Sequence, residues 1–179
     1  ICKKFKLMDT RKFAMNYGLY LGIGLSLINF ISYYLGLDLS RPLVFFILRN
    51  LLIGYSIFYI INLYKENNNG FISYELAVKL GTTLLFYSSV IIALYNYVFI
   101  NFINIGFVDE FIIYQQNAIL SSDPNIDDDQ LDFFLNFLRK MLSPIPFALI
   151  TVIQYSFVGF IYSLIIGSFT KKEDPNLIV

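Results

Sequence analysis

The chain has no histidine, no tryptophan and a single cysteine, and charged residues make up 15% of its 179 positions. Without histidine, this chain cannot build a Ser-His-Asp triad or a His-ligated metal site. Cys2 has no second cysteine for an internal disulfide, and no lipobox-like small residues precede it, which argues against a lipoprotein anchor. These absences remove the commonest kinds of catalytic and metal chemistry.

The scarcity of charge also argues against a soluble fold, because soluble domains are nearer one quarter charged. Hydrophobic residues reach 57% and the mean hydropathy is +0.64. Lysine plus arginine equals aspartate plus glutamate at 13 each, so no basic excess suggests a nucleic-acid partner. The composition predicts a protein whose main partner is the lipid bilayer.

Four apolar stretches are long enough to cross about 30 Å of hydrocarbon, which takes roughly 20 helical residues. They predict an all-α integral membrane four-helix bundle, a single domain over residues 1–179 with spans at about 13–37, 42–64, 80–105 and 143–170. The first span is too long for a cleaved signal peptide and lacks an A-x-A-like site, so we expect a retained anchor.

The distribution of lysine and arginine predicts the orientation of the spans. Nine bases flank the spans on one side (Lys3, Lys4, Lys6, Arg11, Lys12, Lys65, Lys79, Lys171, Lys172) and three on the other (Arg41, Arg139, Lys140). If the chain started at Met8 instead of Ile1, six bases would remain on the first side against three on the other. We therefore expect a multi-pass protein of the bacterial inner membrane with both termini in the cytoplasm.

The long connection, residues 109–142, is expected to be periplasmic and to contain one amphipathic helix over about 124–142. Asp123 would cap this helix and Pro124 would open it, with the acids at 127–129 near its positive end. Those acids lack the spacing of an EF-hand, so no metal site is predicted. Ser143 and Pro144 would make a sharp turn, with Ser143 capping the last span.

The apolar face of that helix is expected to lie in the outer membrane–water interface, against lipid or the bundle. The alternative is that this face binds a partner protein. Its residues recur at helical spacing: Leu131, Phe134, Leu135 and Leu138.

Arg49 is the one charged residue inside the second span, where an arginine costs about 2.5–3.5 kcal/mol on insertion scales. Counting along each span places a polar layer in the outer half of the bilayer, formed by Asn29, Arg49, Asn50, Asn96 and Gln154. In one interpretation the layer lines a hydrated pocket in which Arg49 pairs with an anion such as a lipid phosphate. In the other, Arg49 extends to Asp38, Asp109 or Glu110, while the amides link helices.

Small residues recur every fourth position in two spans and would allow close approach of helix backbones. They are Gly18 and Gly22 in the first span, and Gly159, Ser163 and Gly167 in the last. We expect the first and fourth spans to pack together through them, within the chain or in a dimer.

Several short segments, in this order, resemble one family: "NYGLYLGIG", "NGFISYELAVKLG", "ALYNYVFINFI", the "SP" that opens the last span and a lysine-rich ending. It is the Bacteroidota membrane family catalogued as domain of unknown function 4199, and the resemblance covers nearly the whole chain. It implies a four-helix inner-membrane protein and supplies no catalytic residues. Genes of this family often lie near family-two glycosyltransferases, which implies such an enzyme as a partner.

The functional expectation follows from these features together. No paired acids, histidine or cysteine lie in the spans, and no cofactor is implied. We expect a non-catalytic integral inner-membrane subunit that anchors or stabilises a larger cell-envelope complex with other membrane proteins. The alternative is a lipid-handling or lipid-linked-sugar transport partner of a membrane glycosyltransferase. An intramembrane enzyme is the third hypothesis.

Overall fold

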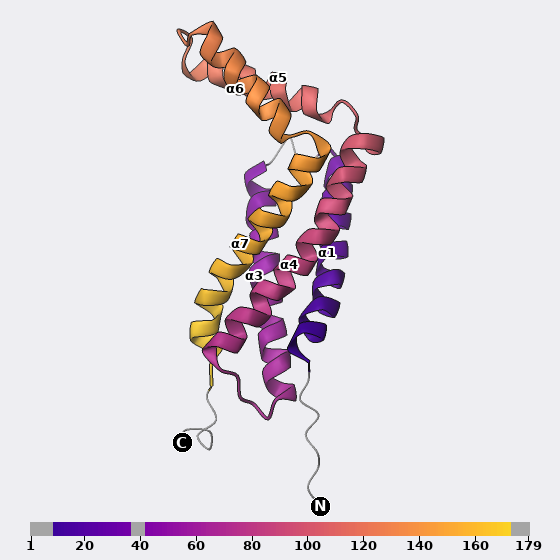
Figure 1. Ribbon diagram of the computed structural model, residues 1–179, viewed down its shortest axis with the longest axis vertical. Coiled ribbons are helices and arrows are strands. Elements are labelled where there is room, and N and C mark those ends of the chain that lie inside the picture. Colours follow the sequence, from indigo (N-terminus) through magenta and orange to yellow (C-terminus); the bar gives the residue numbers. More distant parts are fainter. Residues whose placement is uncertain (1–8, 37–41, 173–179) are drawn as a thin grey trace, which may run out of the picture. The chain divides into compact units, whose positions relative to one another are not determined.

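The computed structural model describes residues 9–36 and 42–172, which are helical apart from turns and one isolated bridge (Figure 1). Four helices are long and apolar enough to cross a membrane, so the prediction of a multi-pass all-α membrane protein is confirmed. The elements are α1 (Thr10–Tyr34), α3 (Pro42–Asn67), α4 (Tyr74–Val98), the π-helical turn η1 (Phe99–Ile103), α5 (Phe107–Ser122), α6 (Asp128–Met141) and α7 (Pro144–Thr170).

Capping residues and turns explain where the helices begin and end. The Asp9 carboxylate accepts hydrogen bonds from the backbone N–H groups of Arg11 and Lys12, so α1 begins at Thr10. At its other end Gly36 has a φ of +63°, the left-handed conformation that commonly terminates a helix. The Ser73 hydroxyl accepts from the Leu76 N–H, and α4 therefore starts at Tyr74.

The described residues divide into two compact units: those up to Ile92 together with those from Val152 onward, and Ala93–Thr151. In the first unit α1, α3, the first part of α4 and most of α7 form the bundle. Its core is a continuous cluster of isoleucine and leucine side chains that includes Ile57, Ile61, Leu80 and Leu84.

The central element of this bundle is α4. Buried residues make up 44% of its most apolar window, against 17–28% for the other three spans. Its small residues permit this burial, because backbones approach closely where side chains are short. The arrangement of the other helices in the bundle therefore follows from their contacts with α4.

Both stripes of small residues contact α4, so the expected pairing of the first and fourth spans is wrong. A Cβ added at Gly18 would lie 2.6 Å from the Leu84 carbonyl oxygen, and one at Gly22 would lie 2.7 Å from the Ser88 carbonyl oxygen. On α7, Gly159 lies against Leu85, Ser163 against Gly81 and Gly167 against Ala77 and Tyr74. The spacing identified the faces that allow close approach, but α4 is the neighbour of both.

Contacts at one end of the bundle tie segments that are distant in sequence. The Thr10 and Tyr64 hydroxyls lie 3.0 Å apart, and the Lys65 Nζ donates to the Thr170 carbonyl at 2.9 Å. Ile72 forms an antiparallel bridge with Lys172. The start of α1, the turn between α3 and α4 and the end of α7 therefore lie at the same end (Figure 1).

In the second unit the predicted single helix is instead a hairpin of two helices, α5 and α6. They share a small core of Ile112, Leu131 and Leu135. Arg139 of α6 forms an ion pair with Asp109 of α5. The face of Leu131, Leu135 and Leu138 therefore packs on α5, rather than on lipid or the bundle as expected, whereas Phe134 is exposed.

The boundaries of α6 also correct the prediction. The cap is Asp127, whose carboxylate accepts from the Gln130 N–H, and not Asp123, which ends α5. The Ser143 hydroxyl donates to the Lys140 carbonyl in the last turn of α6, while the Ser143 backbone carbonyl accepts from the Phe147 N–H in the first turn of α7. The expected interruption is present, because α6 ends at Met141 and α7 begins at Pro144.

Candidate functional site

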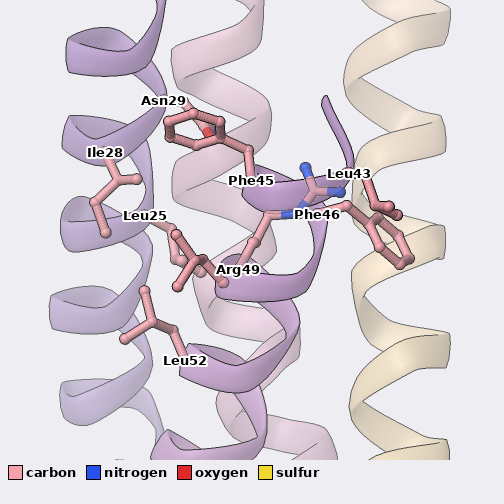
Figure 2. Close-up of a pocket in the computed structure, with 9 residues that line it drawn as sticks. Leu25, Ile28, Asn29, Leu43, Phe45, Phe46, Arg49 and Leu52 are labelled. Carbon is pink, nitrogen blue, oxygen red and sulfur yellow. The ribbon is translucent and has the colours of Figure 1, made fainter. Parts of the chain in front are cut away.

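Arg49 lies seven residues after Pro42, in the second turn of α3, and is half-buried. Figure 2 shows its guanidinium directed back along α3, toward Leu43 and Phe46. This is the direction expected for an arginine that extends toward the nearer end of its span. The direction agrees with the second interpretation, in which the side chain extends toward an end of the span (Figure 2), whereas the depth of Arg49 in a bilayer stays a prediction.

The contacts of Arg49 within the described residues are made with aromatic side chains. Its guanidinium carbon lies 5.9 Å from the centre of the Phe46 ring, within the range of a cation–π contact. The Tyr155 hydroxyl of α7 also lies close enough for the Arg49 charge to act on it. Asp109 pairs instead with Arg139, and Asp38 lies outside the described residues.

A groove runs between α1 and α3 beside Arg49 (Figure 2). It encloses about 690 Å³ and is lined by three residues of α1 and six of α3. Asn29 and Arg49 are its two polar members, and the others are leucine, isoleucine or phenylalanine. A guanidinium has five N–H donors, more than the Tyr155 hydroxyl can accept, so donors remain for a molecule in the groove. The groove thus combines an apolar wall with a positive polar end.

The other amides of the expected polar layer have separate partners. Asn50 accepts a hydrogen bond from the Tyr162 hydroxyl at 3.0 Å and donates to the Phe46 carbonyl, so it links α3 to α7. In the second unit the Asn96 amide donates to the Thr151 hydroxyl at 3.0 Å, which links α4 to α7. These two contacts are the interhelical bonds of the second interpretation.

Gln154, the remaining amide of the expected layer, has an exposed side chain on α7. Its neighbour Tyr155 faces Arg49 instead, and Tyr162 faces Asn50. Sequence reasoning missed both tyrosines. Their spacing of seven residues puts them on one face of α7, and this was the available signal.

The hairpin of the second unit leaves aromatic side chains exposed, although it has its own core. Phe133 of α6 is 77% exposed and Phe137, one turn later, is 50% exposed. The acids of the first turn of α6, Asp128 and Asp129, lie near its positive end as expected. The α5 helix was missed because most of its residues fall in the segment 109–142, which was read as a loop with a single helix near its end.

Comparison with known proteins gives a family and no closer relative. The family model described as "Protein of unknown function (DUF4199)" matches residues 16–172, nearly the whole chain. The chain belongs to this family. No curated protein and no solved structure matches it.

The matched part of this DUF4199 protein contains the Arg49 groove, both tyrosines of α7 and the α5–α6 hairpin. The groups that the groove presents are a guanidinium and an amide, which bind anions and hydrogen-bonding groups. In residues 9–36 and 42–172 no three His, Cys, Asp or Glu side chains lie close enough together to hold a metal ion. The chemistry offered by the groove is binding.

Proposed function

We propose that this DUF4199 protein is a non-catalytic subunit that anchors or stabilises a larger complex of the cell envelope. It would lie in the bacterial inner membrane, with both termini in the cytoplasm. The observation that carries the proposal is the α5–α6 hairpin, which has its own core and ion pair and still exposes Phe133 and Phe137. Aromatic residues of this kind are enriched in protein interfaces, and a preformed surface loses little entropy on binding.

The proposed orientation is supported by the contacts at one end of the bundle. The start of α1, the α3–α4 turn and the end of α7 meet there, and each carries lysine or arginine. Bases concentrated on one side mark the cytoplasmic side. The hairpin would then be on the periplasmic side, where its partner would be an envelope protein.

Purification of the tagged chain from native membranes in mild detergent, followed by quantitative mass spectrometry, tests the subunit proposal. The double variant Phe133→Asp with Phe137→Asp changes exposed positions and leaves the hairpin core intact. We expect it to lose a specific partner by about tenfold or more, as when an interface hot spot is removed.

The matched control is Asn136→Asp, which adds a negative charge at an exposed position of the same helix. It should retain the partner. If the unchanged protein, the double variant and the Asn136→Asp control co-purify with the same proteins at equal yield, the hairpin is rejected as the docking surface. The support for the subunit proposal is then lost as well.

A second function is favoured by the groove at Arg49. It is the handling of a lipid or lipid-linked sugar, in partnership with a membrane glycosyltransferase. The apolar lining fits acyl chains, and Arg49 with Asn29 fits a phosphate at the polar end. Photo-crosslinking with a phospholipid that carries its reactive group near the headgroup should label the groove, and Arg49→Leu should lower the labelling. Equal labelling of both chains would reject this function.

A further inference from the structure

A second polar pocket lies in the bundle, bordered by α1, α4 and α7. It encloses about 420 Å³ and contains two cations, Arg11 of α1 and Lys79 of α4. Three threonines, a tyrosine and a serine also line it, and among the described residues no acidic side chain does. Two positive charges thus share one pocket, and the lining residues that the structure describes supply no negative charge.

The direction of the Arg11 side chain is unusual. Its Nε donates to the Tyr87 hydroxyl at 3.1 Å. Gly18 lies beside Leu84 and Gly22 beside Ser88, so α1 and α4 run parallel in a constant register. Gly18 also lies beside the Tyr87 Cβ, so the Arg11 backbone lies seven residues, or about 10 Å along the helix axis, before that contact, and the Tyr87 side chain spans part of this distance. The side chain therefore extends along α4 toward the middle of the span.

An arginine at the end of a membrane helix ordinarily extends outward to water. Here the Tyr87 hydroxyl holds the guanidinium on the membrane side of its own backbone, in the same pocket as the Lys79 ammonium. A cation held beside membrane-spanning helices is stabilised by a counter-charge or water, and hydroxyl groups alone do not neutralise it. The pocket therefore has the electrostatics of an anion site.

The carboxylates nearest in sequence do not line the pocket. Asp9 caps α1 by accepting from the Arg11 and Lys12 N–H groups. Glu75 borders a neighbouring pocket, which it shares with Lys79. Neither of them forms an ion pair with Arg11 or Lys79 in the described part of the chain.

We propose that this pocket binds the phosphate of an anionic phospholipid from the leaflet at that end of the bundle. Arg11 and Lys79 would contact the phosphate oxygens, because guanidinium and ammonium groups form strong charge-assisted hydrogen bonds with phosphate. Phe86, which is 44% exposed beside them, would contact the glycerol and first methylenes. Basic pockets between membrane helices hold lipid headgroups in this way.

The lipid is favoured over free phosphate by the place of the pocket. It opens on the side of membrane-spanning helices and includes the apolar ring of Phe86, which inorganic phosphate would leave unused. The inference does not rest on the proposed function, since it uses neither the Arg49 groove nor the hairpin.

Native mass spectrometry of the purified full chain in detergent tests the proposal. The chain is titrated in turn with phosphatidylglycerol, phosphatidylcholine and inorganic phosphate. We expect phosphatidylglycerol to bind most tightly. Lys79→Gln and Arg11→Gln should each weaken its binding about tenfold, which corresponds to about 1.4 kcal/mol. The matched control Lys12→Gln removes an exposed cation that does not line the pocket and should change binding less than about twofold, as expected for a distant surface charge.

Three results would overturn the proposal: equal binding of the two lipids, an equal loss with Lys12→Gln, or binding of inorganic phosphate without preference for the anionic lipid. Lys79 is exposed, so Lys79→Gln should fold normally, and its thermal unfolding without added lipid checks this. Tyr87→Phe keeps both charges but removes the hydroxyl that holds Arg11, and should also weaken phosphatidylglycerol binding. Unchanged binding in this variant would contradict the assigned role of Arg11.

Discussion

Replacing Gly22 by alanine tests the close contact between α1 and α4. A Cβ at this position would lie 2.7 Å from the Ser88 carbonyl oxygen and 2.8 Å from the Ile91 Cβ. No rotamer change can move either atom, so the two helices must separate. Gly24 lies on the same helix, and a Cβ there would meet no atom within 4 Å. Gly24→Ala is therefore the matched control.

The comparison of the two variants isolates the packing cost. Alanine gains about 0.8–1 kcal/mol of helix propensity over glycine, and this gain is common to both. Overpacking costs about 1–3 kcal/mol. Separation would also weaken the hydrogen bond from the Ser88 hydroxyl to the Gly18 carbonyl, and such a bond contributes about 0.6 kcal/mol in membrane proteins. Gly22→Ala should thus be less stable than Gly24→Ala by about 1.5–3.5 kcal/mol.

The assay is unfolding of the purified protein by sodium dodecyl sulfate in mixed micelles, followed by circular dichroism. Ser88→Ala should not rescue Gly22→Ala, because the obstacle is a backbone carbonyl oxygen that this change leaves in place. If Gly22→Ala and Gly24→Ala agree within about 0.5 kcal/mol, the usual range of neutral substitutions, the close contact with α4 is refuted.

Three further predictions concern topology, Arg49 and the hairpin. In a background without the native cysteine, a cysteine at Asn68 should react with an impermeant thiol reagent after the inner membrane is permeabilised, and one at Asn125 before; the reverse pattern would reject the proposed orientation. Arg49→Leu should remain in the membrane on carbonate extraction, because it removes a transfer cost of about 2.5–3.5 kcal/mol, and its release would contradict this reasoning. Leu135→Asp should unfold the α5–α6 hairpin by burying a carboxylate in its core, whereas Phe133→Asp, at an exposed position, should leave the hairpin folded. Hydrogen exchange distinguishes them, and equal protection in both variants would refute the assigned core.

The sequence by itself determined the membrane class and the position of each span along the chain. Hydrocarbon excludes charged and unpaired polar groups, so about 20 apolar residues identify a spanning helix whatever surrounds it. Helix ends were also predictable where a single residue determines them. Examples are the cap at Ser73 and the interruption before Pro144. The direction of the Arg49 side chain, toward the nearer end of α3, also agreed with the second interpretation (Figure 2).

Only the tertiary structure decided which groups meet. Counting residues gives the height of a side chain along the helix axis, but not which neighbouring helix it faces. For this reason the glycines of α1 and α7 were correctly read as close contacts but assigned to each other instead of to α4. For the same reason, the sequence did not predict that Arg49 faces the Tyr155 hydroxyl of α7. Likewise, the spacing of apolar residues predicted that one face of α6 is buried. It did not predict that α5 is the helix that covers this face.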